Sequence, residues 1–245
     1  MKKNKTVLVT GSSKGIGLSI AKTLSSLDLD VIITGRNHKS LESAIKNEKN
    51  MFFYKADLTI EKELINLVKN IEEKHGNIDI LINNAGDYIY SSIEKTKQID
   101  IDYLLKLNTI APYKLIKETV GQMKEKMWGR IVNIGSISGS VGEANASLYS
   151  MTKASLIGLT KALALELAEY NITVNTINPG WVDTDLANNT DLKNDFSKEE
   201  ILEMIPQRRF VHPLEVANLC KYLISEEARG LTGQSINLCA GLSLG

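Results

Sequence analysis

Short runs of apolar, β-branched residues alternate along the chain with longer segments in which apolar residues recur at every third or fourth position. The short runs are typical of buried strands, and the longer period is typical of helices packed against a core. We predict strands at Thr6–Thr10, Val31–Thr34, Met51–Tyr54, Asp79–Ile82, Ile131–Ile134, Thr173–Ile177 and Ser235–Leu238. We predict helices over Leu18–Leu27, Glu61–His75, Tyr103–Met127 and Leu148–Tyr170. Strands separated by helices predict an α/β fold: a doubly wound (Rossmann) seven-stranded parallel sheet with helices on both faces.

No repeat, low-complexity tract or Pro/Gly-rich linker divides the 245 residues, so we expect one domain over residues 1–245. The irregular region is Asp183–Arg209, which is polar and carries a helical pattern at Ser197–Met204. Substrate lids are drawn from weakly packed segments of this kind, so residues 183–209 predict a lid. The alternative is an ordinary surface segment with no role in substrate binding.

Charge and cysteine usage narrow the classes of function. Basic and acidic side chains number 29 each, so no global field favours nucleic acid or an anionic membrane. No apolar run approaches the roughly 18 residues of a membrane span, and only Val7–Val9 follow the N-terminal lysines. Cys220 and Cys239 stand apart from each other and from the scattered histidines, so we expect no metal site and no disulfide. A cytoplasmic protein fits best.

A glycine cluster follows the first predicted strand directly. Thr10-Gly11-Ser12-Ser13-Lys14-Gly15-Ile16-Gly17 leads into the helix at Leu18. Glycines allow a tight turn and the close approach of a pyrophosphate, while free N–H groups at a helix start attract the anion. The first βα junction of a parallel sheet is where such folds bind dinucleotides, so this loop predicts a nucleotide site.

The residue type after the second strand helps to distinguish a site for NAD(H) from a site for NADP(H). An NAD site usually places an acidic residue there, whereas a 2′-phosphate calls for an arginine. The chain reads Ile33-Thr34-Gly35-Arg36-Asn37, with no acid, and Lys14 in the glycine loop can add a second positive charge. We therefore predict NADP(H); a solvated surface arginine is the alternative.

Tyr149 and Lys153 are four residues apart, so they share one face of the predicted helix. An ammonium group beside a phenol favours the phenolate, which would lower the phenol pKa from about 10 toward working pH. Tyr149 could then serve as a general acid or base. Taken alone, this spacing also occurs on ordinary solvent-exposed helices.

Further motifs follow in a fixed order: Asn83-Asn84-Ala85-Gly86, Asn108, Ser136, the Tyr149/Lys153 pair, and Pro179-Gly180 before Thr184. With Thr10-Gly-x-x-x-Gly-x-Gly17 they resemble the short-chain dehydrogenase/reductase family, closest in motif to 3-oxoacyl-acyl-carrier-protein reductases. The resemblance covers nearly the whole chain.

The resemblance implies roles for these residues. Asn108, Ser136, Tyr149 and Lys153 would be catalytic: Ser136 orients the substrate carbonyl, Asn108 binds a water that relays protons toward Lys153, and Ser138 is a weaker candidate beside Ser136. Residues of the cofactor site would be Gly11, Ser13, Lys14, Gly15, Ile16, Gly17, Arg36, Asp57, Leu58, Asn84, Ala85, Gly86, Tyr149, Lys153, Pro179, Gly180, Val182 and Thr184. Asp57 could also cap the helix that starts near Ile60, and this role is compatible with cofactor binding.

The implied function is NADPH-dependent reduction of a ketone, with a 3-oxoacyl thioester as one candidate and Tyr149 as general acid. The alternatives are a dehydrogenase of a small free alcohol, sugar or steroid, and a nucleotide-binding protein without catalysis. A substrate carried by acyl carrier protein would need two docking arginines, whose places hold Met127 and Tyr170, although Lys124, Lys126 and Arg130 lie nearby as substitutes.

The pocket and the assembly complete the predictions. Substrate-pocket candidates are Asp87-Tyr88-Ile89-Tyr90, Glu143, Asn145, Trp181 and Leu186. By analogy with the family, the helices Tyr103–Met127 and Leu148–Tyr170 would form a homodimer or homotetramer.

Overall fold

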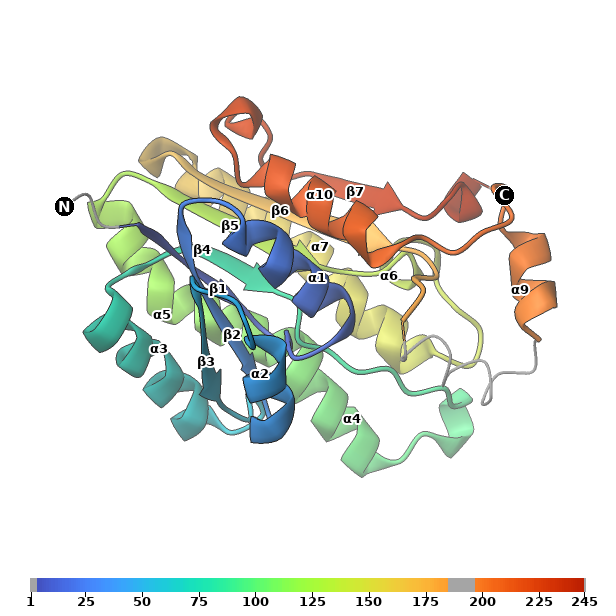
Figure 1. Cartoon of the computed structure of the whole chain (residues 1–245). Helices are drawn as coiled ribbons and strands as arrows, with labels where there is room; N and C mark the ends of the chain where they lie inside the picture. Colours follow the sequence, from blue (N-terminus) through green and yellow to red (C-terminus); the bar gives the residue numbers. More distant parts are fainter. Residues whose placement is uncertain (1–3, 185–196, 245) are drawn as a thin grey trace.

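The computed structural model describes residues 4–184 and 197–244. A parallel sheet of seven strands runs through it in the order β3-β2-β1-β4-β5-β6-β7 (Figure 1). The strands are β1 (Lys5–Val9), β2 (Leu29–Gly35), β3 (Met51–Lys55), β4 (Ile78–Asn83), β5 (Gly129–Ile134), β6 (Ile172–Pro179) and β7 (Ser235–Leu238). Each predicted strand is present within a few residues of its predicted bounds, and the predicted fold class is confirmed. The chain order reverses between β1 and β4, and parallel sheets bind ligands beside such a point.

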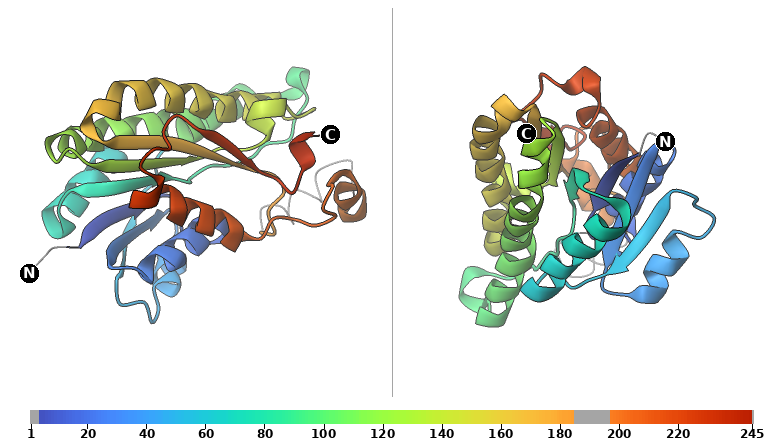
Figure 2. Two further views of the ribbon diagram at one scale, coloured as in Figure 1. Left: turned by 90° about the horizontal axis from the view of Figure 1, so that it is seen from above. Right: turned by 90° about the vertical axis from the view of Figure 1, so that its left-hand side faces the viewer.

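Helices cover both faces of the sheet (Figure 2). One face carries α1 (Gly15–Ser25), α2 (His38–Ala44) and α10 (Pro213–Leu223), and the other carries α3 (Glu61–His75), α5 (Ala111–Glu125) and α7 (Ser147–Leu167). Successive strand residues supply the two cores in alternation: Val7 and Val9 pack with α1 and α10, while Leu8 packs with α3. Burial on both faces explains why the strands read as continuous apolar runs.

The helix predicted at Tyr103–Met127 is longer in the structure and is interrupted by a π-helical turn. It begins earlier, as α4 (Gln98–Leu104), passes through a π-helical turn at Leu105–Ile110, and continues as α5. A π-helical turn shifts the side chains that follow it around the helix axis, and such turns occur frequently at functional sites. Asn108 lies within this turn.

Among the described residues, three α-helices were not predicted: α2, the single turn α6 (Ser138–Val141) and α10. The signal for α10 is present in the sequence, since Pro213 stands at its first turn and His212 and Glu215 form a capping box. For the short α2, Asn37 caps the backbone N–H of Ser40 at 3.0 Å.

The segment predicted as a lid is only partly described, because residues 185–196, and with them the pocket candidate Leu186, lie outside the described residues. Its second half forms α9 (Lys198–Met204), which begins at a capping box between Ser197 and Glu200. Ile201 and Ile205 are each 1% exposed and pack in the core. The expectation of weak packing is therefore wrong for this half, because buried isoleucines anchor it.

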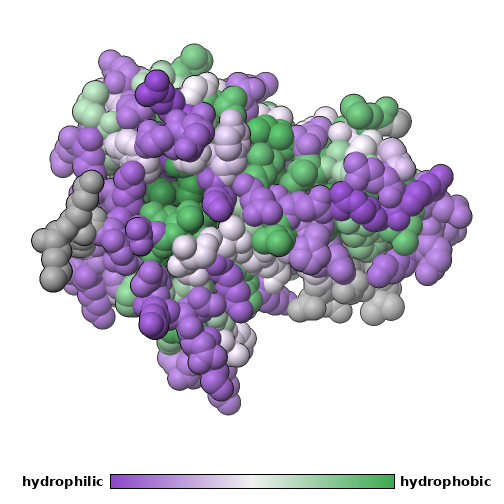
Figure 3. Space-filling view, turned by 45° about the horizontal axis from the view of Figure 1, so that its top comes forward, coloured by the Kyte–Doolittle hydropathy of each residue, from purple (hydrophilic) through white to green (hydrophobic). Residues whose placement is uncertain are grey.

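Polar side chains cover most of the face that carries α10 and β7, and apolar residues gather in patches between them (Figure 3). The strand β7 forms one edge of the sheet, and its residues are partly exposed. Within the described ranges, the helices are too short or too polar to cross a membrane.

Candidate active site

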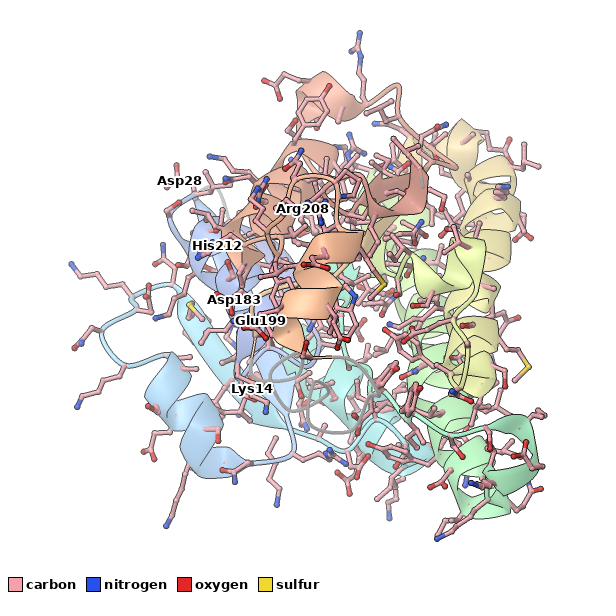
Figure 4. All side chains as sticks on the ribbon, turned by 90° about the vertical axis from the view of Figure 1, so that its right-hand side faces the viewer. Lys14, Asp28, Asp183, Glu199, Arg208 and His212 are labelled. Atoms are coloured by element: carbon pink, nitrogen blue, oxygen red, sulfur yellow. The ribbon has the colours of Figure 1, made fainter. Side chains whose placement is uncertain are left out.

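A cavity of about 820 Å³ opens where the strands end, between the glycine loop and α9. Figure 4 looks onto this edge and labels Lys14 just before α1, Asp183 in the segment after β6, and Glu199 in the first turn of α9. Every predicted site residue except Asn108 lines the cavity: Gly11, Ser13, Lys14, Gly15, Ile16, Gly17, Arg36, Asp57, Leu58, Asn84, Ala85, Gly86, Ser136, Ser138, Tyr149, Lys153, Pro179, Gly180, Val182 and Thr184. The fold thus gathers residues from all parts of the chain at one opening.

The glycine loop is a tight cradle with no room for side chains at its centre. Gly11 has φ +60°, and a Cβ there would lie 2.7 Å from the Cα of Ala85. Asn84 holds the loop from the opposite side, because its Nδ2 donates to the carbonyl oxygens of Thr10 (2.9 Å) and Gly11 (3.0 Å). The Thr10 hydroxyl in turn accepts from the backbone N–H groups of Asn84 and Ala85. The two predicted motifs therefore form one unit.

This cradle fits a phosphate group. The first turn of α1 starts at Gly15 with no side-chain cap and no acidic residue. Its N–H groups and the positive end of the helix dipole are left to an anion from outside the helix. Lys14 and Arg36 are both exposed at the rim of the cavity. The residues present therefore match a pyrophosphate with an additional phosphate beside Arg36.

Asp57 lines the cavity next to Leu58. Its Oδ1 accepts from the backbone N–H of Thr59 (2.9 Å) and from the Thr59 hydroxyl (2.7 Å). The helix α3 begins after Ile60, which supplies no side-chain cap. The predicted role of Asp57 as a cap on this helix is wrong, because its carboxylate accepts hydrogen bonds from Thr59, which precedes the helix, and not from the N–H groups of the first helical turn.

Tyr149 and Lys153 lie on one face of α7 as predicted, with Lys153 Nζ 5.7 Å from the centre of the Tyr149 ring. Their protonation differs from the prediction. Burial raises the pKa of Tyr149 to about 12, a hydrogen bond with Ser136 lowers it in part, and the carboxylates of Glu143 and Asp87 raise it further. Burial lowers the pKa of Lys153 to about 8.

The predicted lowering of the Tyr149 pKa is therefore wrong for the protein by itself. Lys153 Nζ donates to the Ile134 carbonyl oxygen at 2.9 Å, and the loss of solvation outweighs its charge at the phenol. The Tyr149 phenol is therefore protonated at neutral pH.

Ser136 and Ser138 are joined in a hydrogen-bonded chain. The Ser136 hydroxyl bonds to the Ser138 hydroxyl at 3.1 Å, and the Ser138 hydroxyl donates to Glu143 Oε2 at 2.7 Å. The other carboxylate oxygen of Glu143 accepts from the Tyr88 hydroxyl at 2.6 Å. The Tyr88 ring meets the Tyr149 ring edge-on, with centroids 4.8 Å apart.

Asn108 is 1% exposed and lies behind the cavity wall. Its Oδ1 accepts from the Asp87 N–H (3.0 Å), and its Nδ2 donates to the Asp87 carbonyl oxygen (2.9 Å) and to Thr152 (3.1 Å). A Cβ on Gly86 would touch both Asn108 Oδ1 and Lys153 Nζ at 3.2 Å. Asn108 therefore ties the Gly86 turn to α7 at the point where Lys153 reaches the cavity.

The end of β6 and the segment that follows it, Pro179–Thr184, form another part of the cavity wall. The Gly180 N–H donates to the Leu238 carbonyl oxygen at 3.0 Å, and Val182 bridges to Val211 in parallel fashion. Thr184 then lies opposite Gly15, whose added Cβ would be 3.6 Å from the Thr184 methyl group. These contacts place Pro179–Thr184 across the cavity from the glycine loop.

Several lining residues were not predicted. They include Leu107 from the π-helical turn, Ile201 and Met204 from α9, and Leu242 near the C-terminus. Only tertiary packing brings these four to the cavity. Tyr103 was also missed: its hydroxyl accepts from Arg36 at 3.3 Å and donates to Asp87 at 3.0 Å. Of the pocket candidates, Asp87, Tyr88, Tyr90, Glu143, Asn145 and Trp181 line the cavity.

Of the predicted substitutes for the docking arginines, Arg130 is buried, whereas the Lys126 side chain is 41% exposed. Arg130 is 0% exposed and donates to the carbonyl oxygens of Gly129 and Asn171. Lys126 is paired with Asp79 at 2.5 Å. Lys124 lies over the Tyr170 ring, 4.8 Å from its centre, and Met127 is exposed. Within the described ranges, the acidic, histidine and cysteine side chains form no group that could hold a metal ion.

Comparison with known proteins identifies the family of the chain. The sequence matches the family model for the short chain dehydrogenase over residues 5–195, and the chain belongs to that family. It is 37% identical to the 3-oxoacyl-acyl-carrier-protein reductase FabG of Aquifex aeolicus, covering 97% of both chains. It is 36% identical to the uncharacterized oxidoreductase YxjF of Bacillus subtilis, covering 96% of both.

Two solved structures have the same architecture. A variant of the actinorhodin polyketide ketoreductase with NADPH superposes with a TM-score of 0.94 at 33% identity, covering 98% of this chain and 97% of that one. ElxO with NADP bound superposes with a TM-score of 0.91 at 31% identity, covering 99% and 100%.

Proposed function

We propose that the protein is an NADPH-dependent oxidoreductase that reduces a ketone to a secondary alcohol, with Tyr149 as the general acid. The observation that carries this proposal is the single cavity shared by Tyr149, Lys153 and Ser136 with the glycine loop. The similar actinorhodin ketoreductase with NADPH and ElxO with NADP support the cofactor. Bound NADPH would supply the hydride.

The chain's own residues would hold NADP(H) at four places. The loop from Gly11 to Gly17 accepts the pyrophosphate, and Lys14 and Arg36 hold the 2′-phosphate as charge-assisted hydrogen-bond donors. Asp57 and Leu58 line the adenine end, while Asn84–Gly86 and Pro179–Thr184 flank the nicotinamide end.

The protein's part in the chemistry is to place the carbonyl and deliver a proton. Ser136 orients the carbonyl oxygen beside the Tyr149 hydroxyl, which donates its proton to that oxygen. The raised pKa of Tyr149 keeps the phenol protonated at neutral pH, which is the form that a general acid needs. The Lys153 ammonium offsets the negative charge that remains on Tyr149. Asn108 positions the Gly86 turn and, by our proposal, a water that returns a proton toward Lys153.

For the substrate, we propose a 3-oxoacyl thioester, on the similarity to 3-oxoacyl-acyl-carrier-protein reductase FabG. Docking of a carrier protein receives little support from this chain. Met127 and Tyr170 stand at the positions of the docking arginines, and Arg130 and Lys126 are engaged elsewhere. We therefore propose a thioester that the enzyme recognises mainly by its acyl chain.

Assembly and location stay predictions. Exposed apolar side chains occur on the long helices, with Tyr113 55%, Met151 51% and Leu165 85% exposed. They support a homodimer or homotetramer built on α5 and α7. We propose a cytoplasmic location on the balance of charge and the reduced cysteines.

The test is NADPH oxidation with a panel of ketones: a 3-oxoacyl thioester of N-acetylcysteamine, its carrier-protein form, β-keto esters and cyclic ketones. We expect reduction of at least one class by the wild type. Tyr149→Phe should slow it by about a hundredfold or more, because the general acid is lost. Activity that survives this substitution would refute the role of Tyr149. A large advantage of the carrier-bound form would refute recognition by the acyl chain alone.

A further inference from the structure

The substrate side of the cavity carries negative charge. Among the lining residues that the structure describes, Asp87 and Glu143 place carboxylates around Tyr149. Lys14 and Arg36 lie at the glycine-loop end. Arg36 is linked to Asp87 through the Tyr103 hydroxyl, whereas Glu143 has no such link among the described residues. The remaining cation, Lys153, is 5% exposed and its Nζ is bonded to the Ile134 carbonyl oxygen. A ketone placed beside Tyr149 would therefore lie near these carboxylates.

Glu143 is held firmly by neutral donors. Its two oxygens accept from the hydroxyls of Ser138 (2.7 Å) and Tyr88 (2.6 Å). The salt bridges found within residues 4–184 and 197–244 do not include Glu143. Neutral hydroxyl donors orient a carboxylate without cancelling its charge. The Glu143 carboxylate is therefore held in one position, and its negative charge is not neutralised by these partners.

Both hydrogen-bond partners of Glu143 adjoin the reacting hydroxyl. Ser138 is bonded to Ser136, and the Tyr88 ring packs edge-on against Tyr149 at 4.8 Å. The field of Glu143 reaches the phenol, since its carboxylate contributes to the raised pKa of Tyr149. A second anion placed beside the reacting carbonyl would feel the same field.

We infer that Glu143 is a specificity-determining residue whose carboxylate discriminates against ketones with an anionic group beside the carbonyl and favours uncharged ketones. The inference rests on the proposed ketone reduction and narrows its substrates. Like charges repel strongly in a partly desolvated cavity, and Lys153, the cation beside Tyr149, is already bonded to the Ile134 carbonyl oxygen and serves Tyr149 itself. A thioester or ester next to the ketone satisfies this requirement, whereas a free carboxylate does not.

The experiment compares the best-reduced keto ester of the panel with its free carboxylate, using NADPH and the full-length protein. The measured quantity is the ratio of kcat/KM for the ester to kcat/KM for the carboxylate. Glu143→Gln keeps the shape of the side chain and removes the charge. We expect the wild type to prefer the ester and Glu143→Gln to reduce that preference by about tenfold, as expected for loss of one nearby charge.

Two control variants separate charge from other effects. Glu94→Gln removes a carboxylate from an exposed position outside the cavity, so it should leave the ratio unchanged. Tyr88→Phe removes one hydrogen bond to Glu143 but keeps the carboxylate, so the ratio should stay near the wild-type value. NADPH binding, titrated by fluorescence, reports whether each variant is folded.

Each outcome decides something. An unchanged ratio in Glu143→Gln, with the ester still reduced, would overturn the inference and leave the proposed function standing. A Tyr88→Phe effect as large as that of Glu143→Gln would also overturn it, because hydrogen-bond geometry would then set the preference. If the wild type reduces no ketone, the proposed function itself fails, and the inference fails with it.

Discussion

Gly17 is the position at which the phosphate cradle leaves least room. A Cβ built there would lie 2.6 Å from the Gly11 carbonyl oxygen and 2.9 Å from the Ser12 Cα, and nearer still to Asn84 Nδ2. Two of these three neighbours are backbone atoms, so rotation of the Asn84 side chain alone cannot make space. Gly17→Ala must displace the loop.

The cost follows from two terms. Overpacking a tight site costs about 1–3 kcal/mol. Displacing Asn84 also weakens its hydrogen bonds to the Thr10 and Gly11 carbonyl oxygens, each worth about 1 kcal/mol. We expect Gly17→Ala to lower the free energy of unfolding by about 3 kcal/mol, or Tm by about 6–12 °C for a chain of this size. NADPH affinity should fall as well, because the displaced loop is the proposed pyrophosphate site.

The matched control is Gly121→Ala, the same substitution on the exposed side of α5, where a Cβ meets nothing within 4 Å. Alanine favours a helix over glycine by about 0.5–1 kcal/mol, so this variant should be slightly more stable than the wild type. Thermal unfolding and an NADPH titration of the three proteins measure both effects. A Gly17→Ala protein with wild-type Tm and NADPH affinity would refute the close packing of the cradle.

Two further predictions concern charge. Arg36→Ala should lower the preference for NADPH over NADH by about tenfold to a hundredfold, because one charge-assisted phosphate contact is lost. Steady-state kinetics with both nucleotides measure this preference. An unchanged preference would place the phosphate elsewhere. Burial lowers the pKa of Lys153 to about 8 and raises that of Tyr149 to about 12, so with rising pH the ammonium loses its proton first. The kcat/KM for ketone reduction should therefore fall above a pH of about 8, and a profile that is flat to about pH 10 would contradict this assignment.

The sequence by itself determined the class of fold and most of the cavity wall. Short apolar runs predicted all seven strands because the central strands are buried on both faces and must be apolar, while the edge strands β3 and β7 keep enough apolar residues to be recognised. The loops at the strand ends are polar and glycine-rich because they approach a ligand, so Gly11–Gly17, Asn84–Gly86 and Pro179–Thr184 could be recognised as motifs.

The tertiary structure alone decided the electrostatics of the reacting centre. Spacing on a helix predicted that Tyr149 and Lys153 are neighbours, but burial sets their pKa values, and burial depends on every element around them. Glu143 shows the same limit: its carboxylate is bonded to Tyr88, which lies 55 residues earlier in the chain. Local sequence patterns encode periodicity and turn chemistry, whereas contacts between distant segments arise only when the sheet brings the strand ends together.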